Sequence, residues 1–157
     1  SNNFYNNKEG LGYPTAIACL RILDSVNLDL KDKNIVVLGQ GTLVGRPVTH
    51  LLRSRGFNVL TIDSHTENIS SLLKNADIII SGIGKGKFIK GDMVKEGVVI
   101  VDAGTSEENG SVIGDVDFES TLEIASYLTP SPGGVGPVTV AVLLENVLKV
   151  AENKKII

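Results

Sequence analysis

Short, largely apolar runs alternate along this chain with segments whose apolar residues recur at helical spacing. Four runs, residues 35–38, 59–62, 77–81 and 98–102, have the length and composition of buried strands, and Tyr127–Leu128 is a minimal fifth. Helical spacing is clearest over residues 14–27 and 138–153. Apolar strands that alternate with helices are typical of a parallel sheet covered on both faces. The pattern therefore predicts one α/β domain with a doubly wound parallel sheet.

The segments between the strands predict shorter helices and two irregular loops. Helices are expected over 46–55, about 67–75 and 117–125, with a helical turn over 90–95 and an extended piece at 111–113. Residues 104–110 are expected to form a turn-rich loop. Residues 129–137 contain three prolines and three glycines, which excludes regular structure there.

The first strand leads into a glycine-rich turn that is typical of a phosphate site. Gly39, Gly41 and Gly45 follow the pattern GxGxxxG, one residue longer than the usual dinucleotide fingerprint. Glycines let a backbone turn tightly and approach a phosphate, and the next helix directs its N–H groups at the anion. Asp63, at the end of the second strand, is placed to accept a hydrogen bond from a ribose hydroxyl. The alternative is that the glycine turn is only a tight connection between a strand and a helix, and that Asp63 caps the helix that follows it.

Small, polar or glycine residues follow every predicted strand. Ligands of parallel α/β sheets bind at the carboxyl ends of the strands, so these residues are expected to converge on one site. The groups are Gly39–Gly41, Asp63–Ser64, Gly82–Gly84, Gly104–Thr105 and Thr129–Gly136. We predict a dinucleotide site at this edge, with Gly82 and Gly84 among its residues.

The charges near the turn favour NAD over NADP. Gln40 is neutral where an NADP-selective loop usually carries a cation, and Asp63 would repel a 2′-phosphate. Arg46, His65 and Lys85 are cations that could offset this repulsion, but the sequence does not place them.

Composition narrows the function classes. The 157 residues suit one domain, and a net charge of −3 with a pI near 5.4 argues against nucleic acid and anionic membranes as partners. The apolar runs are far shorter than the ~20 residues of a membrane span, so no membrane is expected. The single Cys19 is expected to be a core residue in a cytoplasmic protein. Two histidines fifteen residues apart predict no metal site, and Asp115 and Asp117 are expected to be turn and cap residues.

Several segments together resemble the cofactor-binding domain of the bifunctional methylenetetrahydrofolate dehydrogenase/cyclohydrolase family. The resemblance runs from about residue 10 to the end, with order and spacing preserved. The matching segments are Tyr13–Ala16, Val37–Pro47, Ala76–Ile78, Gly91–Gly97, Gly114–Phe118 and Thr129–Thr139.

The resemblance implies an activity and a set of site residues. That family oxidises 5,10-methylenetetrahydrofolate with a nicotinamide cofactor and hydrolyses the 5,10-methenyl product to 10-formyltetrahydrofolate. The resemblance also implies a Rossmann-type domain. The residues implied to contact the cofactor are Gly39, Gln40, Gly41, Ser64 and Thr105. Those implied to form the folate edge of the cleft are Pro132, Gly133, Gly134, Val135 and Gly136.

The chain departs from the family in three places. The family's Gly-Arg-Ser turn reads Gly39-Gln40-Gly41 here, and the histidine common after the second strand is Asp63; both changes point toward NAD. The family's amino-terminal half, which carries the catalytic Tyr and Lys, has no counterpart. We therefore assign no catalytic residue and expect a lead-in over residues 1–13 and a binding domain over 14–157.

The missing half leaves several functions open. The helices at 14–27 and 138–153 would join that half, and the chain would bind dinucleotide without catalysing alone. The expected occupants of their apolar faces are a separately encoded catalytic half or a second copy in a homodimer. A stand-alone NAD-binding regulatory module is the remaining alternative.

Overall fold

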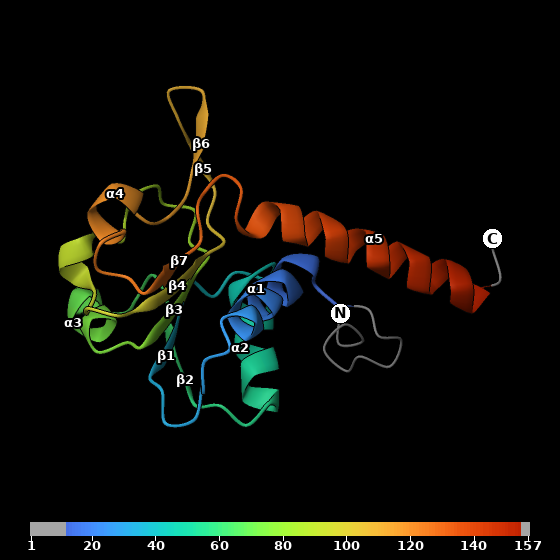
Figure 1. Ribbon diagram of the computed structural model, residues 1–157, viewed down its shortest axis with the longest axis horizontal. Coiled ribbons are helices and arrows are strands. Elements are labelled where there is room, and N and C mark those ends of the chain that lie inside the picture. Colours follow the sequence, from blue (N-terminus) through green and yellow to red (C-terminus); the bar gives the residue numbers. More distant parts are fainter. Residues whose placement is uncertain (1–11, 155–157) are drawn as a thin grey trace.

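A five-stranded parallel sheet forms the centre of the computed structural model, which describes residues 12–154 (Figure 1). Its strands lie in the order β2-β1-β3-β4-β7, and all four neighbouring pairs are parallel. Their bounds are β1 (Ile35–Leu38), β2 (Val59–Ile62), β3 (Ile78–Ser81), β4 (Val99–Asp102) and β7 (Tyr127–Leu128). The chain steps from β1 outward to β2 and then crosses back to β3 on the other side of β1. The carboxyl ends of β1 and β3 therefore flank the position where ligands bind in such sheets.

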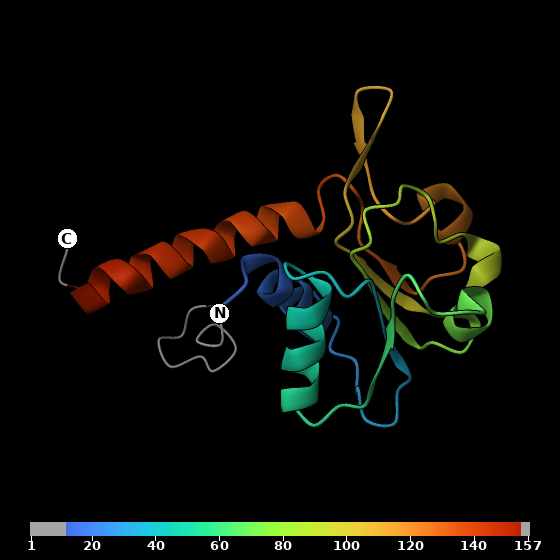
Figure 2. The same ribbon diagram turned by 180° about the vertical axis from the view of Figure 1, so that it is seen from behind.

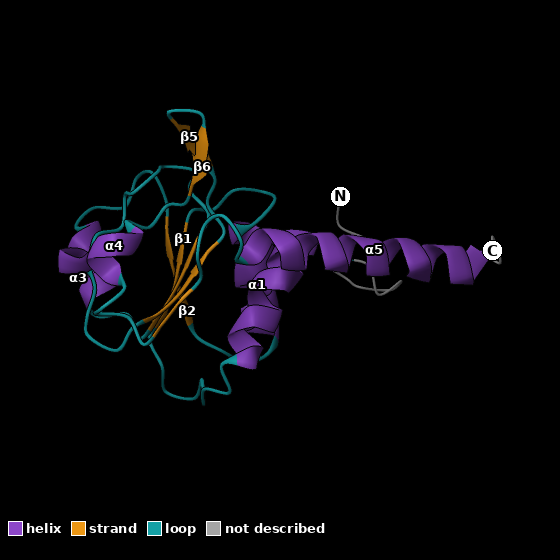
Figure 3. Cartoon of the chain, turned by 45° about the horizontal axis from the view of Figure 1, so that its top comes forward, coloured by secondary structure: helices purple, strands orange, loops and turns teal. Residues whose placement is uncertain are grey.

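Helices cover both faces of the sheet (Figure 3). One face carries α1 (Pro14–Ser25), α2 (Gly45–Ser54) and α5 (Val135–Lys154); the other carries α3 (Ile69–Lys74), the 3₁₀ turn η1 (Gly91–Met93) and α4 (Phe118–Thr121). Successive strand residues point to opposite faces, so Ile35 and Val37 join one core and Val36 and Leu38 the other. The doubly wound fold predicted from the sequence is confirmed.

Two predicted loops contain regular structure. Residues 104–110 include β5 (Ser106–Glu108), which pairs antiparallel with β6 (Ser111–Ile113) in a hairpin that projects beyond the sheet (Figure 1). Asn109 and Gly110 both have positive φ, as a two-residue hairpin turn requires. The helix predicted from 138 begins at Val135, because Pro137 is tolerated in a first turn, where N–H groups lack helical partners.

The predicted helix ends are also adjusted. The helix predicted over 14–27 ends at Ser25, and that over 67–75 is limited to Ile69–Lys74. The helix predicted over 117–125 is α-helical only over Phe118–Thr121. The expected lead-in over 1–13 lies mostly outside the described residues.

Helix α5 packs its first part on α1 and then extends away from the sheet (Figure 2). Arg21 of α1 donates two hydrogen bonds to the Glu145 carboxylate, at 2.8 and 2.6 Å, and Val142 is buried in the shared core. The outer face of α5 is apolar and half exposed or more, at Val140, Leu143, Leu144, Val147 and Leu148. Among the helices of residues 12–154, none has the length and apolar character needed to span a bilayer.

Candidate functional site

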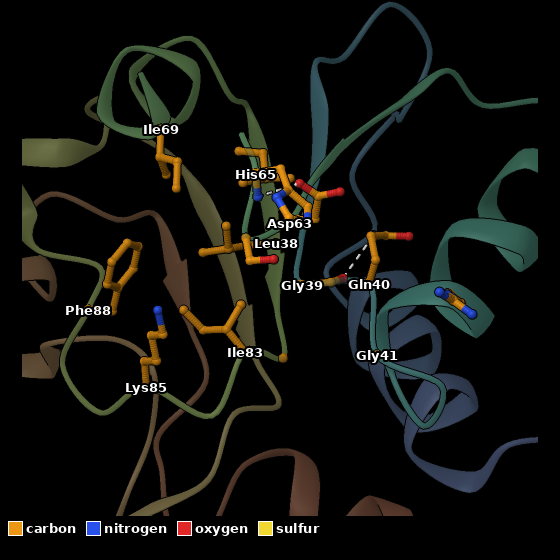
Figure 4. Close-up of a pocket in the computed structure, with 14 residues that line it drawn as sticks. Leu38, Gly39, Gln40, Gly41, Asp63, His65, Ile69, Ile83, Lys85 and Phe88 are labelled. Atoms are coloured by element: carbon orange, nitrogen blue, oxygen red, sulfur yellow. Dashed lines mark hydrogen bonds between the residues drawn. The ribbon is translucent and has the colours of Figure 1, made fainter. Parts of the chain in front are cut away.

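A cleft of about 590 Å³ lies at the carboxyl ends of β1, β2 and β3 (Figure 4). Six of the predicted cofactor residues line it together: Gly39, Gln40, Gly41, Asp63, Ser64 and Gly82. These residues come from three separate segments, and the parallel register of β1 with both neighbours brings them to one edge. The predicted convergence of strand ends is thus present for the first three strands.

The glycine turn is held by close backbone packing. Gly39 has a φ of +94°, donates to the Ile62 carbonyl at 2.7 Å, and leaves no room for a Cβ, which would lie 2.8 Å from the Gly82 oxygen. A Cβ at Gly45 would lie 1.8 Å from the Gly39 oxygen. These glycines are therefore required by the fold itself.

Gly41 differs from its neighbours in the turn. A Cβ added there would meet no atom within 4 Å, and its φ is not positive. The packing of residues 12–154 therefore gives no reason for a glycine at this position. A backbone segment without a side chain, facing open space in a cleft, is the arrangement that a close-lying phosphate group requires.

Asp63 projects its carboxylate into solvent at the end of β2. Its Oδ1 accepts hydrogen bonds from the His65 backbone N–H at 2.9 Å and from the Thr66 hydroxyl at 3.1 Å. These hydrogen bonds, led by that from His65, lower the pKa of Asp63 below its ordinary value. The alternative reading of Asp63 as the cap of the next helix is wrong, because α3 begins after Asn68.

The Gln40 side chain is folded against its own turn. Its Nε2 donates to the Gly39 carbonyl at 2.8 Å and lies 3.4 Å from the Thr49 hydroxyl (Figure 4). A carbonyl only accepts, so the amide nitrogen must face it. The Gln40 oxygen is then left to accept a hydrogen bond from another group.

Three basic side chains that the sequence could not place line the same cleft. Arg46 belongs to the first turn of α2, His65 follows Asp63, and Lys85 lies across the cleft from Gln40 (Figure 4). The Lys85 ammonium is 5.9 Å from the centre of the Phe88 ring. The cleft therefore contains positive charge as well as the negative charge of Asp63.

Apolar residues form much of the remaining lining, and sequence reasoning missed them. They are Leu38, Ile62, Ile69, Ile83 and Phe88. Leu38 and Ile62 end strands, so they are indistinguishable from core residues in the sequence. Ile83 lies within the predicted Gly82–Gly84 turn and Phe88 follows it by four residues, and that position was the available signal.

A second cleft, of about 560 Å³, is lined by the residues that the family resemblance implied to form the folate edge. Pro132, Gly133, Gly134, Val135 and Gly136 line it together. Thr105, predicted to contact the cofactor, lines this second cleft rather than the first. Gly84 lines neither, and its φ of +69° gives it a role in the turn.

The fold and the position of the first cleft define a Rossmann-type α/β domain. The family model described as the NAD(P)-binding domain of tetrahydrofolate dehydrogenase/cyclohydrolase matches residues 13–155, and the chain belongs to this family. In the part of the chain that the structure describes, no three His, Cys, Asp or Glu side chains are grouped to hold a metal ion.

Named relatives agree with this assignment. The chain is 46% identical over 147 residues to the bifunctional protein FolD of Fusobacterium nucleatum, covering 92% of this chain and 52% of that protein. The crystal structure of the bifunctional FolD enzyme from Campylobacter jejuni is similar with a TM-score of 0.85 and 41% identity, over 92% of this chain and 51% of that one. The Trypanosoma brucei enzyme, solved with NADP and an inhibitor, is similar with a TM-score of 0.86 and 30% identity, over 100% of this chain and 58% of that one. The chain spans about half the length of the curated relatives it matches.

Proposed function

We propose that this chain is the dinucleotide-binding part of an enzyme that oxidises 5,10-methylenetetrahydrofolate and hydrolyses 5,10-methenyltetrahydrofolate. Family membership supports the reaction class. The single observation that carries the binding role is Gly41, a glycine that the fold does not need, open to the cleft beside the N-terminus of α2. A pyrophosphate lying against Gly39–Gly41 would face the positive dipole end of α2, where the Arg46 N–H donates to the Gly41 carbonyl at 3.0 Å and Pro47 has no N–H.

The remaining lining suits the other parts of a dinucleotide. Asp63 and the Gln40 oxygen are acceptors, and ribose hydroxyls are donors. Ile69, Ile83 and Phe88 offer an apolar wall for an adenine ring. The nicotinamide end would then extend toward the second cleft, where the Pro132–Gly136 loop would hold the folate beside it.

We infer that NAD is preferred over NADP. Asp63 carries a carboxylate, whose hydrogen bonds lower its pKa further below the ordinary value, and a 2′-phosphate beside it would be repelled. The Gln40 nitrogen is already occupied, so this side chain offers a phosphate an acceptor rather than a donor. Arg46 and Lys85 supply the opposing attraction, which makes Asp63 the residue to vary in testing this preference.

Catalysis is proposed to need a second polypeptide segment. Proton transfer requires a positioned acid or base, and the one carboxylate lining the second cleft in the described residues, Asp102, is bound by three backbone N–H groups. The exposed apolar face of α5 supports docking of a catalytic half there. A second copy of this chain in a homodimer is the alternative occupant.

The test is an assay of NADH and NADPH formation with 5,10-methylenetetrahydrofolate, together with dinucleotide titrations in the presence and absence of a folate analogue. We expect dinucleotide binding and no turnover by the chain alone. Turnover at ordinary enzyme rates would contradict the need for a second segment. Dinucleotide binding that ignores the folate analogue, even after a catalytic half is supplied, would favour a stand-alone regulatory module instead.

A further inference from the structure

Two aspartates are buried next to each other between the two clefts. Asp102 ends β4 and is 3% exposed, and Asp115 follows the β5–β6 hairpin and is fully buried. The sequence predicted Asp115 only to be a turn residue, and it does lie at a bend, but its burial and its long-range hydrogen bonds were not predicted. Buried carboxylates are costly unless hydrogen bonds satisfy them, so their partners indicate what they hold in place.

Asp115 holds the turn that follows β3. Its Oδ2 accepts from the Ser81 hydroxyl at 2.7 Å and from the Ile83 N–H at 2.8 Å, and its Oδ1 accepts from the Lys85 N–H at 2.9 Å. Ile83 and Lys85 both line the dinucleotide cleft. Gly82, which lies between the bonded residues Ser81 and Ile83, lines it as well. One carboxylate therefore holds the part of the cleft lining that Gly82, Ile83 and Lys85 provide.

Asp102 in turn fixes Asp115. Its Oδ1 accepts from the N–H groups of Gly104 and Asp115, at 2.9 and 3.1 Å, and its Oδ2 accepts from Val116 at 2.9 Å. Neighbouring glycines make room for the pair, since a Cβ at Gly104 would lie 1.9 Å from the Asp115 carboxyl carbon. Gly114 has a similar role, because a Cβ added there would lie 2.1 Å from the Asp102 Oδ2.

We propose that Asp115 is a positioning residue of the dinucleotide cleft, which acts by holding the Gly82–Lys85 turn in its binding conformation. This inference rests on the proposed function. Three donors converge on the carboxylate, and only a group with two acceptor oxygens satisfies all three. Asparagine has nearly the same shape, but its NH₂ would have to face at least one backbone N–H.

The test compares Asp115→Asn with Asp77→Asn in the full chain. Asp77 lies at the opposite end of β3, accepts from the Asn34 N–H at 2.7 Å and from Lys95 at 2.6 Å, and lines neither cleft. We expect Asp115→Asn to weaken binding of the preferred dinucleotide by about tenfold or more, because it leaves a buried donor unsatisfied, while Asp77→Asn leaves the affinity unchanged. Equal affinities in both variants would overturn the proposal.

Amide hydrogen exchange separates positioning of the turn from general loss of stability. In Asp115→Asn, exchange at Ile83 and Lys85 should accelerate while the amides within β1 and β3 stay protected; uniform acceleration would contradict the proposal. If this variant does not fold, Ser81→Ala removes one of the three bonds, and we expect about threefold weaker binding; an unchanged affinity would overturn the idea. Hydrogen exchange is measured without dinucleotide, so it tests the positioning role of Asp115 on its own. A wild-type chain that binds neither NAD nor NADP would contradict the proposed function without deciding that role.

Discussion

At the scale of single residues, the glycines around the first cleft divide according to what a side chain would meet. A Cβ at Gly39 would meet the backbone oxygen of Gly82, and one at Gly45 would meet that of Gly39, whereas Gly41 faces open space. A residue that the fold does not require is the stronger pointer to a ligand, because its cost in chain entropy has no compensation within the folded domain.

Gly39→Ala and Gly41→Ala should therefore behave oppositely. Gly39→Ala is expected to destabilise the fold by about 2 kcal/mol or more, through its positive φ and the contact with the Gly82 oxygen. Gly41→Ala should change stability by less than about 0.5 kcal/mol and lower dinucleotide affinity about tenfold, because the methyl group takes the space of a phosphate. Thermal melts and titrations measure the two effects, and normal binding by a folded Gly41→Ala chain would contradict the assignment.

Asp63→Asn tests the cofactor preference. Removing the negative charge should strengthen NADP binding by about tenfold while NAD binding changes less, since a neutral amide still bonds to ribose hydroxyls. Ser64→Ala is a useful control, because it lies in the same segment and carries no charge. Parallel titrations with both dinucleotides give the answer, and an unaltered NADP to NAD ratio would show that Asp63 does not select the cofactor.

Local chemistry explains which site residues the sequence could reveal. Gly39, Asp63 and Ser64 stand at strand ends, and strand ends are readable from short apolar runs. The role of Asp115 beyond a turn could not be predicted, because its partners, Ser81 and Lys85, are about thirty positions away and no local pattern encodes that contact.

At the scale of elements, the strands were predictable and several boundaries were not. Runs of Ile and Val buried on both faces are characteristic of a parallel sheet, so β1, β3 and β4 are explicit in the sequence. β5 was read as part of a loop because it has only three residues and is mostly exposed, whereas β6 coincides with the extended piece predicted over 111–113. Asn109-Gly110 was nevertheless a direct signal for a hairpin turn.

Helix α1 offers a chemical test of its burial. Cys19 is completely buried between α1 and the sheet, and burial raises the pKa of its thiol to about 12. Since the thiolate is the reactive form, a thiol-reactive dye at pH 8 should label the folded chain only as fast as it unfolds. Denaturant should restore rapid labelling with one dye per chain. Rapid labelling of the native chain would contradict the packing of α1.

At the scale of the whole molecule, the chain combines two clefts with one helix whose apolar face is exposed. The clefts open at the carboxyl side of the sheet. Helix α5 extends away from the sheet (Figure 1), and its outer face is apolar and exposed. An apolar face of this kind is expected to be covered in the working assembly.

Leu144→Asp should separate folding from assembly. Leu144 is 60% exposed, so the substitution should leave the melting temperature of the isolated chain nearly unchanged and abolish association with a catalytic half or a second copy. Val142→Asp is the matched control, because Val142 is 1% exposed and its replacement should unfold the contact between α1 and α5. Sedimentation velocity measures association. Undiminished association of the Leu144→Asp chain would exclude this face.

Calorimetric titration of the intact chain with NAD and with NADP tests the central claim most directly. We predict saturable heat with a stoichiometry of one dinucleotide per chain, tighter for NAD, and largely lost in Gly41→Ala at unchanged stability. The absence of heat and of any melting shift with both dinucleotides at millimolar concentration would contradict the claim that the first cleft is a dinucleotide site.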